Sequence, residues 1–324
     1  MLRTPFCELF DADVPILQAA TWPGTTPELV AAVCEAGAVG TIAGVFSSAD
    51  ELSESVRRVR TLTDRPFVVN HVVPALDEDA FEATLAARPA AVSFALGDPA
   101  GLVERVHTAG AKVIHQVHTV SQARAAAAHG VDVVIAQGSE AGGQGMAAGV
   151  GAMALVPQVV DAVAPIPVLA AGGVADGRGL AGALALGAAG ANVGTRFLAS
   201  SEAGIEEDWK RRIVAIEAEE AVHFETWSAI MPPPPPGAYD VVPRVIRTDF
   251  VGEWEERPDD AAQQAERLRA EIMGAVRGGR AHELTPFTGQ TAGLIHGVRP
   301  AGEIVRAMAT EADRALEQAL PALG

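Results

Sequence analysis

Neutral amide side chains stand at or near the ends of several short apolar runs in this sequence. Asn70, Gln116 and Gln137 each follow residues rich in Val, Ile and Ala. An amide offers N–H donors and a carbonyl acceptor, so several amides at one place suit a flat ring with alternating donors and acceptors, such as an isoalloxazine. Taken singly, each amide is better explained as a loop residue that is hydrogen-bonded to its own surroundings.

Two glycine turns follow two later apolar runs. Gly172-Gly173 precedes an expected helix start at Asp176, and Gly194 is followed by the hydroxyl of Thr195. Glycine lets the main chain approach a ligand closely and direct N–H groups at an anion. We therefore expect a phosphate site at these two turns, with ligand-free tight turns as the alternative. No Walker-type Gly-Lys-Ser and no Gly-x-Gly-x-x-Gly after a first strand is present, so the phosphate is expected to belong to a cofactor.

The elements that must position these residues follow a repeating pattern. Short β-branched runs alternate with Ala-rich stretches of helical period over roughly the first 200 residues. The expected strands are 14–19, 38–43, 67–71, 91–96, 112–117, 132–137, 167–171 and 191–197. Helices are expected at 26–36, 49–61, 78–87, 99–109, 121–129, 152–162 and 177–186. The pattern predicts an α/β fold, a closed (β/α)₈ TIM barrel, with an open doubly wound sheet as the rival.

The barrel prediction fixes where the chemistry should lie. Active sites of such barrels form at the C-terminal ends of the strands, where the amides and the glycine turns stand. Gly37, Gly110, Gly130 and Gly187 end helices just before strands and predict left-handed caps there. We expect residues 1–200 to form the barrel domain.

The alternating pattern of apolar runs and Ala-rich stretches ends near residue 200. Residues 201–285 are charged and helix-prone, with a proline run at 232–236 that excludes helix and inner strand. We expect a separate helical insertion that covers the barrel mouth as a lid. Residues 286–324 contain Gly289-Gln290-Thr291-Ala292-Gly293 and a stretch of helical period at 301–320, expected to return to the barrel.

Composition excludes several classes of protein. Of the 324 residues, 24 are Lys or Arg and 41 are Asp or Glu, which gives a net charge of −17 and disfavours nucleic-acid or anionic-membrane binding. The sequence shows no signal peptide and no membrane span, so we expect a cytoplasmic protein. Two cysteines make no disulfide framework, and no metal-ligand spacing is present, so we expect no metal site.

Four motifs together resemble one family. They are Pro15-Ile16-Leu17-Gln18-Ala19, residues 137–143 (Gln-Gly-Ser-Glu-Ala-Gly-Gly), residues 170–178 (Ala-Ala-Gly-Gly-Val-Ala-Asp-Gly-Arg) and Gly194-Thr195-Arg196-Phe197. The chain resembles the nitronate monooxygenase (2-nitropropane dioxygenase) family over nearly its whole length. The resemblance implies an FMN-binding TIM barrel with a smaller helical domain beside the mouth.

Carried over position by position, the resemblance also implies the cofactor contacts. After the first and third strands they are Ala19, Ala20, Thr21 and Asn70. Along the ring they are Gln116, Gln137, Gly142 and Gly143, and around the phosphate they are Gly172, Gly173, Gly194 and Thr195.

The main departure from the family is at Gln144. The family places a histidine directly after the two glycines, and that histidine takes or positions the substrate α-proton. Gln144 cannot accept a proton near neutral pH. Candidate substitutes at strand ends are His71, His115 and His118, of which His118 shares the strand parity of Gln116. We therefore assign Gln144 and His118 as the candidate catalytic residues.

These observations predict an FMN-dependent oxidoreductase that oxidises nitronates or nitroalkanes, with oxygen as electron acceptor. A nitronate is already deprotonated, so its oxidation needs electron transfer more than a base. One alternative is an NAD(P)H-dependent flavin reductase of a quinone or an enoyl thioester. Another, of a different class, is a flavin-binding protein without turnover. We expect a small-molecule substrate, and a homodimer is left open.

Overall fold

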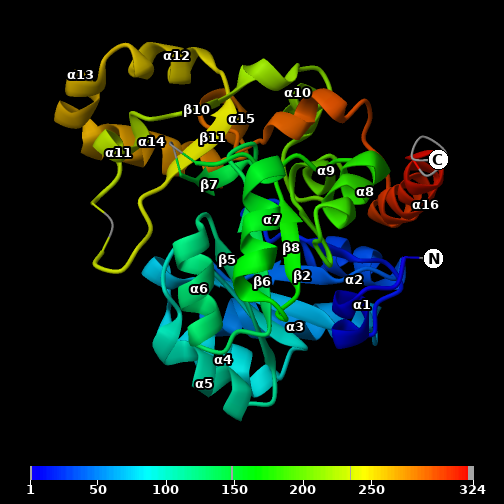
Figure 1. Cartoon of the computed structure of the whole chain (residues 1–324). Helices are drawn as coiled ribbons and strands as arrows, with labels where there is room; N and C mark the ends of the chain where they lie inside the picture. Colours follow the sequence, from blue (N-terminus) through cyan, green and yellow to red (C-terminus); the bar gives the residue numbers. More distant parts are fainter. Residues whose placement is uncertain (1, 147–148, 234, 320–324) are drawn as a thin grey trace.

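Eight parallel strands form a closed barrel in the computed structural model, which describes residues 2–146, 149–233 and 235–319 (Figure 1). The strands are β1 (Ile16–Gln18), β2 (Gly40–Ala43), β3 (Phe67–Val72), β4 (Ala91–Ala95), β5 (Lys112–Val117), β6 (Val133–Gln137), β8 (Val168–Ala171) and β9 (Gly190–Val193). Between β1 and β2, Val39 N–H donates to Ile16 O at 3.0 Å and Gln18 N–H donates to Val39 O at 2.8 Å. The sheet is thereby closed, so the TIM-barrel prediction is confirmed and the open-sheet rival is wrong.

Helices surround the barrel between successive strands. They are α2 (Pro27–Glu35), α3 (Ala49–Leu62), α4 (Glu78–Ala87), α5 (Ala100–Thr108), α6 (Val120–Ala128), α7 (Ala152–Val163) and α8 (Gly177–Ala185), with the short η1 (Val73–Ala75) after β3. Thr26 and Thr119 cap α2 and α6 by accepting main-chain N–H bonds from Leu29 and Gln122. The four glycines expected as left-handed caps have φ between 83° and 90°. Local sequence thus determines where each helix ends and the next strand begins.

The barrel interior is apolar at its lower end. Helix α1 (Pro5–Phe10) places Phe6 and Phe10 against inward side chains of the strands, including Leu17, Val68 and Ile114. All five of these side chains are at most 2% exposed. The lower end of the barrel is therefore filled by these side chains, and the cavity described below lies at the C-terminal ends of the strands.

The eighth barrel strand is shorter than the sequence predicts. The expected strand 191–197 ends at Val193, and α9 (Thr195–Leu198) follows Gly194. A short apolar run does not distinguish strand from helix by period. The turn at Gly194 matters for the site because it directs the N-terminus of α9 at the barrel mouth.

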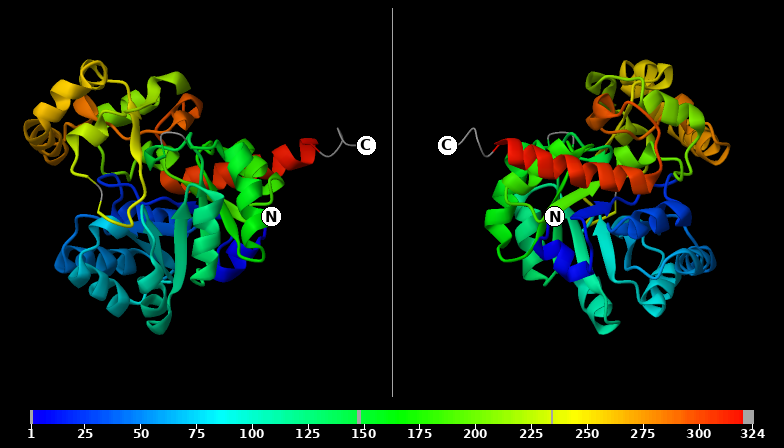
Figure 2. Two further views of the ribbon diagram at one scale, coloured as in Figure 1. Left: turned by 60° about the vertical axis from the view of Figure 1, so that its left-hand side comes forward. Right: turned by 90° about the vertical axis from the view of Figure 1, so that its right-hand side faces the viewer.

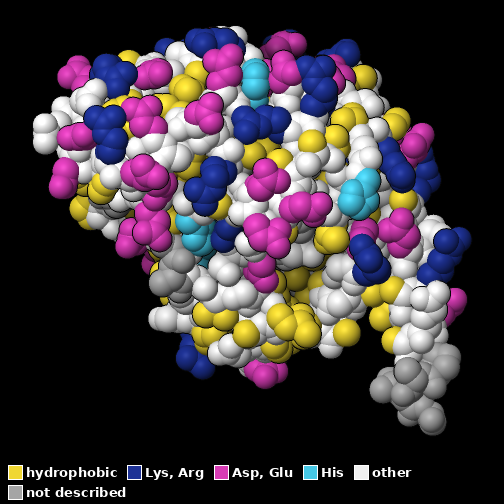
Figure 3. Space-filling view, turned by 90° about the horizontal axis from the view of Figure 1, so that it is seen from above, with side chains coloured by type: hydrophobic (Ala, Val, Ile, Leu, Met, Phe, Trp, Pro, Cys, Tyr) yellow, Lys and Arg dark blue, Asp and Glu magenta, His cyan; other side chains and the backbone are white. Residues whose placement is uncertain are grey.

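Residues 201–285, which we call the cap, lie above the barrel mouth (Figures 1 and 2). The cap contains α10 (Glu207–Ile213), η2 (Ala218–Glu220), β10 (Ala221–His223), α11 (Trp227–Ile230), β11 (Val242–Ile246), α12 (Asp249–Glu255), α13 (Pro258–Gln263), α14 (Ala265–Arg277) and α15 (Ala281–Leu284). It has its own core around Phe224, Val251 and Trp254. Its outer surface carries acidic and basic side chains interspersed (Figure 3). The predicted boundaries at 200 and 285 stay predictions.

The sequence predicts a helical insertion, but the cap also contains the strands β10 and β11. Strand β11 pairs antiparallel with β10 and with β7 (Gly143–Gly145), a strand that belongs to the loop between β6 and α7. This three-stranded sheet joins the cap to the barrel mouth. After the cap come η3 (Gln290–Leu294) and α16 (Ala301–Ala319), which packs against α2 and α8. None of the helices in the described ranges is long and apolar enough to cross a membrane.

Candidate functional site

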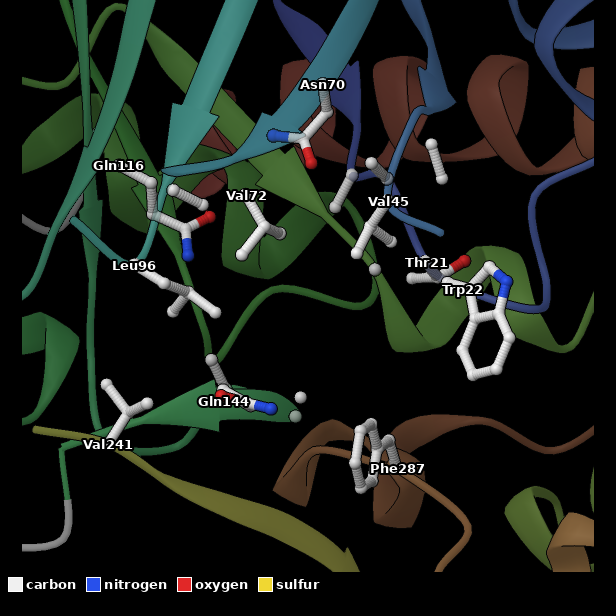
Figure 4. A pocket seen from close by; sticks show the side chains of 18 of the residues that line it. Thr21, Trp22, Val45, Asn70, Val72, Leu96, Gln116, Gln144, Val241 and Phe287 are labelled. Carbon is white, nitrogen blue, oxygen red and sulfur yellow. The ribbon is translucent and has the colours of Figure 1, made fainter. Parts of the chain in front are cut away.

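A cavity of about 520 Å³ lies between the barrel mouth and the cap (Figure 4). Its floor includes Leu17, Ile135 and Ala171 from the barrel, and its upper side includes Trp227 and Phe287. Small-molecule sites typically have volumes of about 300–1,000 Å³ and a mostly apolar lining with a few polar groups. The cavity therefore has the size and composition of a ligand site.

The predicted cofactor contacts converge on this cavity with one exception. Its lining includes Ala19, Ala20, Thr21, Asn70, Gln116, Gln137, Gly142, Gly143, Gly172, Gly194 and Thr195. Gly173 is exposed and does not line the cavity, although it adjoins Gly172. The structure brings these residues together, and their contacts with a cofactor stay predictions.

Neighbouring groups orient two of the three amides. The Asn70 side chain donates to Ser93 O at 3.2 Å and to Ser93 Oγ at 3.1 Å. The Gln137 side chain donates to Gln144 O at 2.9 Å. Because both amide nitrogens are used within the protein, the carbonyl oxygens of Asn70 and Gln137 are left to accept from a ligand.

The glycine turns leave room for close approach. Gly172 has φ +87° and Gly173 has φ +77°, a conformation that strongly favours glycine. A Cβ at Gly173 would meet no atom within 4 Å, and one at Gly194 would lie 3.6 Å from Ala19 Cβ. The Thr195 hydroxyl accepts the Gly289 N–H at 3.0 Å and keeps its own O–H to donate. Main-chain N–H groups and this hydroxyl suit a phosphate without any cation.

Gly142, another residue of the lining, makes a close main-chain contact. A Cβ there would stand 2.4 Å from Gly289 N. Gly142 and Gly289 therefore allow the main chain of the β6–β7 loop to contact the main chain of the segment before η3. Sequence alone does not show which two glycines meet, so this contact is seen only in the structure.

Two buried oxygens in the cavity lack partners. Asn192 Oδ1 and Thr41 Oγ1 have no hydrogen-bond partner, and their residues are 7% and 2% exposed. An unpaired buried polar atom is costly unless a ligand satisfies it. These atoms fit a ligand ring with N–H or O–H donors, as an isoalloxazine has. Neither residue is among the cofactor contacts predicted from the sequence, although each is a lone polar side chain within a short apolar strand.

Gln144 stands in the cavity on β7. Its main chain is fixed by the pairing with Pro243 and by the bond from Gln137, while its side chain extends into the cavity (Figure 4). None of the described lining residues is His, Lys or Arg. The titratable side chains that line it are Tyr239 and Asp240. The position at which the sequence resemblance implies a base therefore holds a neutral amide.

The candidate substitute histidines lie outside the lining. His118 is 2% exposed, neither ring nitrogen has a hydrogen-bond partner, and burial lowers its pKa to about 4 against a smaller opposite effect of the Gln144 main chain. Burial likewise lowers the pKa values of His71 and His115 to about 4. Because β5 ends at Val117, the alternation of side chains along the strand does not extend to His118. Its catalytic role stays a prediction.

Comparison with known proteins agrees with the sequence motifs. A model of the nitronate monooxygenase family matches residues 3–86 and 77–311. The chain is 36% identical over 258 residues to a probable nitronate monooxygenase of Staphylococcus saprophyticus, covering 65% of this chain and 72% of that protein. It is 41% identical over 214 residues to the (3aS,4S,5R,7aS)-5-hydroxy-7a-methyl-1-oxo-octahydro-1H-indene-4-carboxyl-CoA dehydrogenase of Mycobacterium tuberculosis. That match covers 65% of this chain and 60% of the dehydrogenase.

Solved structures extend the likeness over almost the whole chain. FabK from Thermotoga maritima has a TM-score of 0.89 and 33% identity, with 99% of each chain covered. Nitroalkane oxidase from Streptomyces ansochromogenes has a TM-score of 0.79 and 31% identity, with 97% of this chain and 99% of that chain covered. With the barrel, the glycine turns and the family match together, the chain belongs to the nitronate monooxygenase family of flavin-dependent oxidoreductases.

Proposed function

We propose that the protein is an FMN-dependent oxidoreductase that oxidises nitronates with oxygen as electron acceptor, and that Gln144 replaces the usual base. The observation that carries the proposal is the cavity itself: Gln144 extends into it, and no imidazole lines it among the described residues. A nitronate has already lost the acidic α-proton of the parent nitroalkane, so a site without a base still suits it.

The proposed cofactor position follows from the donor set. Asn70, Gln137 and Asn192 would hold the ring, since each offers an amide oxygen at the barrel mouth. Main-chain N–H groups at Gly172 and Gly194, with the Thr195 hydroxyl, would hold the phosphate. A single phosphate site without a dinucleotide motif favours FMN over FAD. Bound FMN supplies electron transfer between substrate and oxygen.

Gln144 would orient the substrate. Its amide offers a donor and an acceptor, so it can hold a nitro or carbonyl oxygen without transferring a proton. The bond from Gln137 and the pairing with Pro243 hold its main chain, so a rigid backbone presents the side chain. Apolar residues that line the same cavity, among them Val72, Leu96 and Phe287, would exclude water from the reacting group.

A second candidate is an NAD(P)H-dependent reductase of a quinone or an enoyl thioester. Two observations favour it: the FabK structure covers 99% of the chain, and a relative at 41% identity is named for a CoA thioester. The cap side of the cavity, with Trp227, Met231 and Ile272, also offers more apolar surface than a small nitro compound needs. The lack of lysine and arginine in the described lining weighs against a pyridine nucleotide whose phosphates bind there.

Two measurements test the cofactor and separate the two candidate functions. Heat release of the flavin followed by chromatography identifies FMN or FAD, and colourless protein that takes up neither contradicts the cofactor assignment. Anaerobic mixing of the flavoprotein with a nitronate, with NADH and with NADPH then shows which compound bleaches the flavin. Bleaching by the nitronate alone supports the first candidate, whereas bleaching by a nicotinamide alone moves the assignment to the reductase.

A further inference from the structure

Residues 235–241 form a wall along one side of the cavity, and we call them the side wall. They are the part of the cap that contacts the end of β4, and Pro235, Ala238, Tyr239, Asp240 and Val241 line the cavity (Figure 4 labels Val241). In the left view of Figure 2 the yellow chain of residues 235–241 lies beside the barrel, below the other elements of the cap. The side wall therefore bounds the space that any substrate must share.

Local sequence shapes the side wall into a turn. Ala238 N–H donates to Pro235 O at 3.1 Å, and Gly237 has φ +86°. Proline second and glycine third, with a positive φ at the glycine, are typical of a type II turn. The turn delivers Ala238 and Tyr239 to the end of β4, where Ala238 bridges Gly97 and Tyr239 N–H donates to Leu96 O at 2.9 Å.

The barrel side of this contact is held in an uncommon conformation. Leu96 has φ +65°, a region that non-glycine residues rarely adopt. Such conformations persist where surrounding contacts enforce them and often mark ligand sites. Here the conformation accompanies the carbonyl contact that receives the side wall, and Leu96 itself lines the cavity.

The Tyr239 side chain makes the second attachment. Its hydroxyl lies 3.0 Å from His115 Nε2, and His115 Nδ1 lies 3.2 Å from Phe94 O. A carbonyl oxygen only accepts, so Nδ1 carries the ring hydrogen and Nε2 accepts from the tyrosine hydroxyl. The His118 ring stands at 89° to the tyrosine ring, with 6.1 Å between centroids. The two buried histidines beside Gln116 thus contact the side wall and not the cavity.

We propose that Tyr239, anchored by His115, is a specificity-determining positioning residue that holds the side wall in place and so limits the size of the substrate. The inference rests on the proposed function only in taking the cavity as the substrate site. Because the side wall faces the cavity with mainly apolar groups, it limits the apolar part of a substrate. Loosening the anchor should therefore favour bulky substrates over small ones.

The chain offers a direct probe, since Tyr239 is its only tyrosine. Nitration by tetranitromethane and the near-ultraviolet absorbance of tyrosinate each report on this one residue without any turnover. Burial raises the Tyr239 pKa to about 12. The flavoprotein is to be compared with His115→Leu and with His71→Leu, a matched control. His71 is also buried, but its ring bonds Thr84 Oγ1 at 2.8 Å and packs against Phe81 instead of Tyr239.

Faster nitration of His115→Leu, by about fivefold for one lost hydrogen bond, with a tyrosine pKa nearer 10 and an unchanged His71→Leu, supports the anchor. Equal rates in all three proteins, or equal acceleration in both variants, overturn it. Tyr239→Phe, which keeps the ring, tests specificity: the ratio of kcat/KM for a bulky over a small nitronate should rise about threefold to tenfold, mainly through KM. An unchanged ratio refutes the specificity role. If no nitronate is turned over, the nitration result still decides the anchor, so the two failures are distinguishable.

Discussion

The side chain of Gln137 donates a hydrogen bond to the main-chain carbonyl of Gln144, with 2.9 Å between nitrogen and oxygen. The last residue of β6 thereby fixes the main chain of Gln144, where the sequence resemblance implies a base in the family. A side chain introduced at 144 should start from the same main-chain position, so substitution there changes chemistry more than geometry.

Gln144→His should restore base catalysis. General-base catalysis typically contributes about 10²–10⁴-fold, so activity on neutral nitroalkanes should rise far more than on preformed nitronates. The new activity should increase with pH through roughly 6 to 7, as the imidazole loses its proton. Steady-state rates with paired nitroalkane and nitronate substrates across pH test this. Gln144→Ala is the control and should cost only a hydrogen bond, on the order of 1 kcal/mol.

A wild-type enzyme that already oxidises neutral nitroalkanes, at a rate that rises as pH increases through about 7, would show that another base acts. Absence of nitro-compound activity in all three proteins would favour the reductase.

Gly194→Leu should weaken flavin retention, because a side chain there fills space that the proposed phosphate needs. Gly194 is the better test than Gly173, whose positive φ makes any substitution strained. Gly182→Leu, on α8, is the control, since a Cβ there meets nothing within 4 Å. Flavin absorbance per protein after gel filtration measures retention. Equal flavin content in both variants would mean that the phosphate lies elsewhere.

His118→Leu should stabilise the protein, and more so in acid. The folded protein holds His118 neutral with a pKa of about 4 because it is buried, whereas the ordinary value is 6.5. As pH falls below 6.5, the unfolded state binds the proton first, so the wild type loses stability through this residue by about 2 kcal/mol at pH 5. Leucine removes that loss and also removes two unpaired ring nitrogens. Denaturant unfolding of the flavoprotein at pH 7.5 and pH 5 measures both effects; a variant with the wild-type pH dependence would contradict the burial of His118.

Arg88→Gly should raise the free energy of unfolding by about 0.5–1 kcal/mol. Arg88 is the exposed C-cap of α4 and has φ +49°, which glycine adopts without strain. Arg124→Gly, at an exposed position within α6, should lower it by about 1 kcal/mol. Urea unfolding of the two variants should give shifts of opposite sign. Destabilisation by both would show that the Arg88 side chain contributes more than its backbone costs.

The barrel was predictable from sequence because each strand is an apolar run between helices with recognisable ends. The range 112–117 matches β5 residue for residue. The cap sheet was not: β7 reads Gly-Gln-Gly, and β11 contains Pro243 and Arg244. Both strands exist through pairing with each other across about 100 residues of chain, which no local pattern reports.

The site was predictable at the level of convergence and not of contact. Strand-end amides and glycine turns had to meet at one mouth once the barrel closed. Which polar atoms remain unpaired depends on packing, so Asn192 and Thr41 emerged only from the structure. The histidines illustrate the same limit, because His115 bonds a tyrosine that is 124 positions away in the sequence.

The shared sheet also sets how the protein can be recombined with its relatives. Because β7 comes from the β6–α7 loop, a chimera that exchanges residues 201–285 alone would separate β11 from its own third strand. A graft that keeps the cap intact must carry residues 143–145 with it, together with the side chain at position 144. Recombination at residues 201 and 285 would therefore replace the cap side of the cavity. It would also leave Gln144 on a β7 strand that must pair with β11 of another protein.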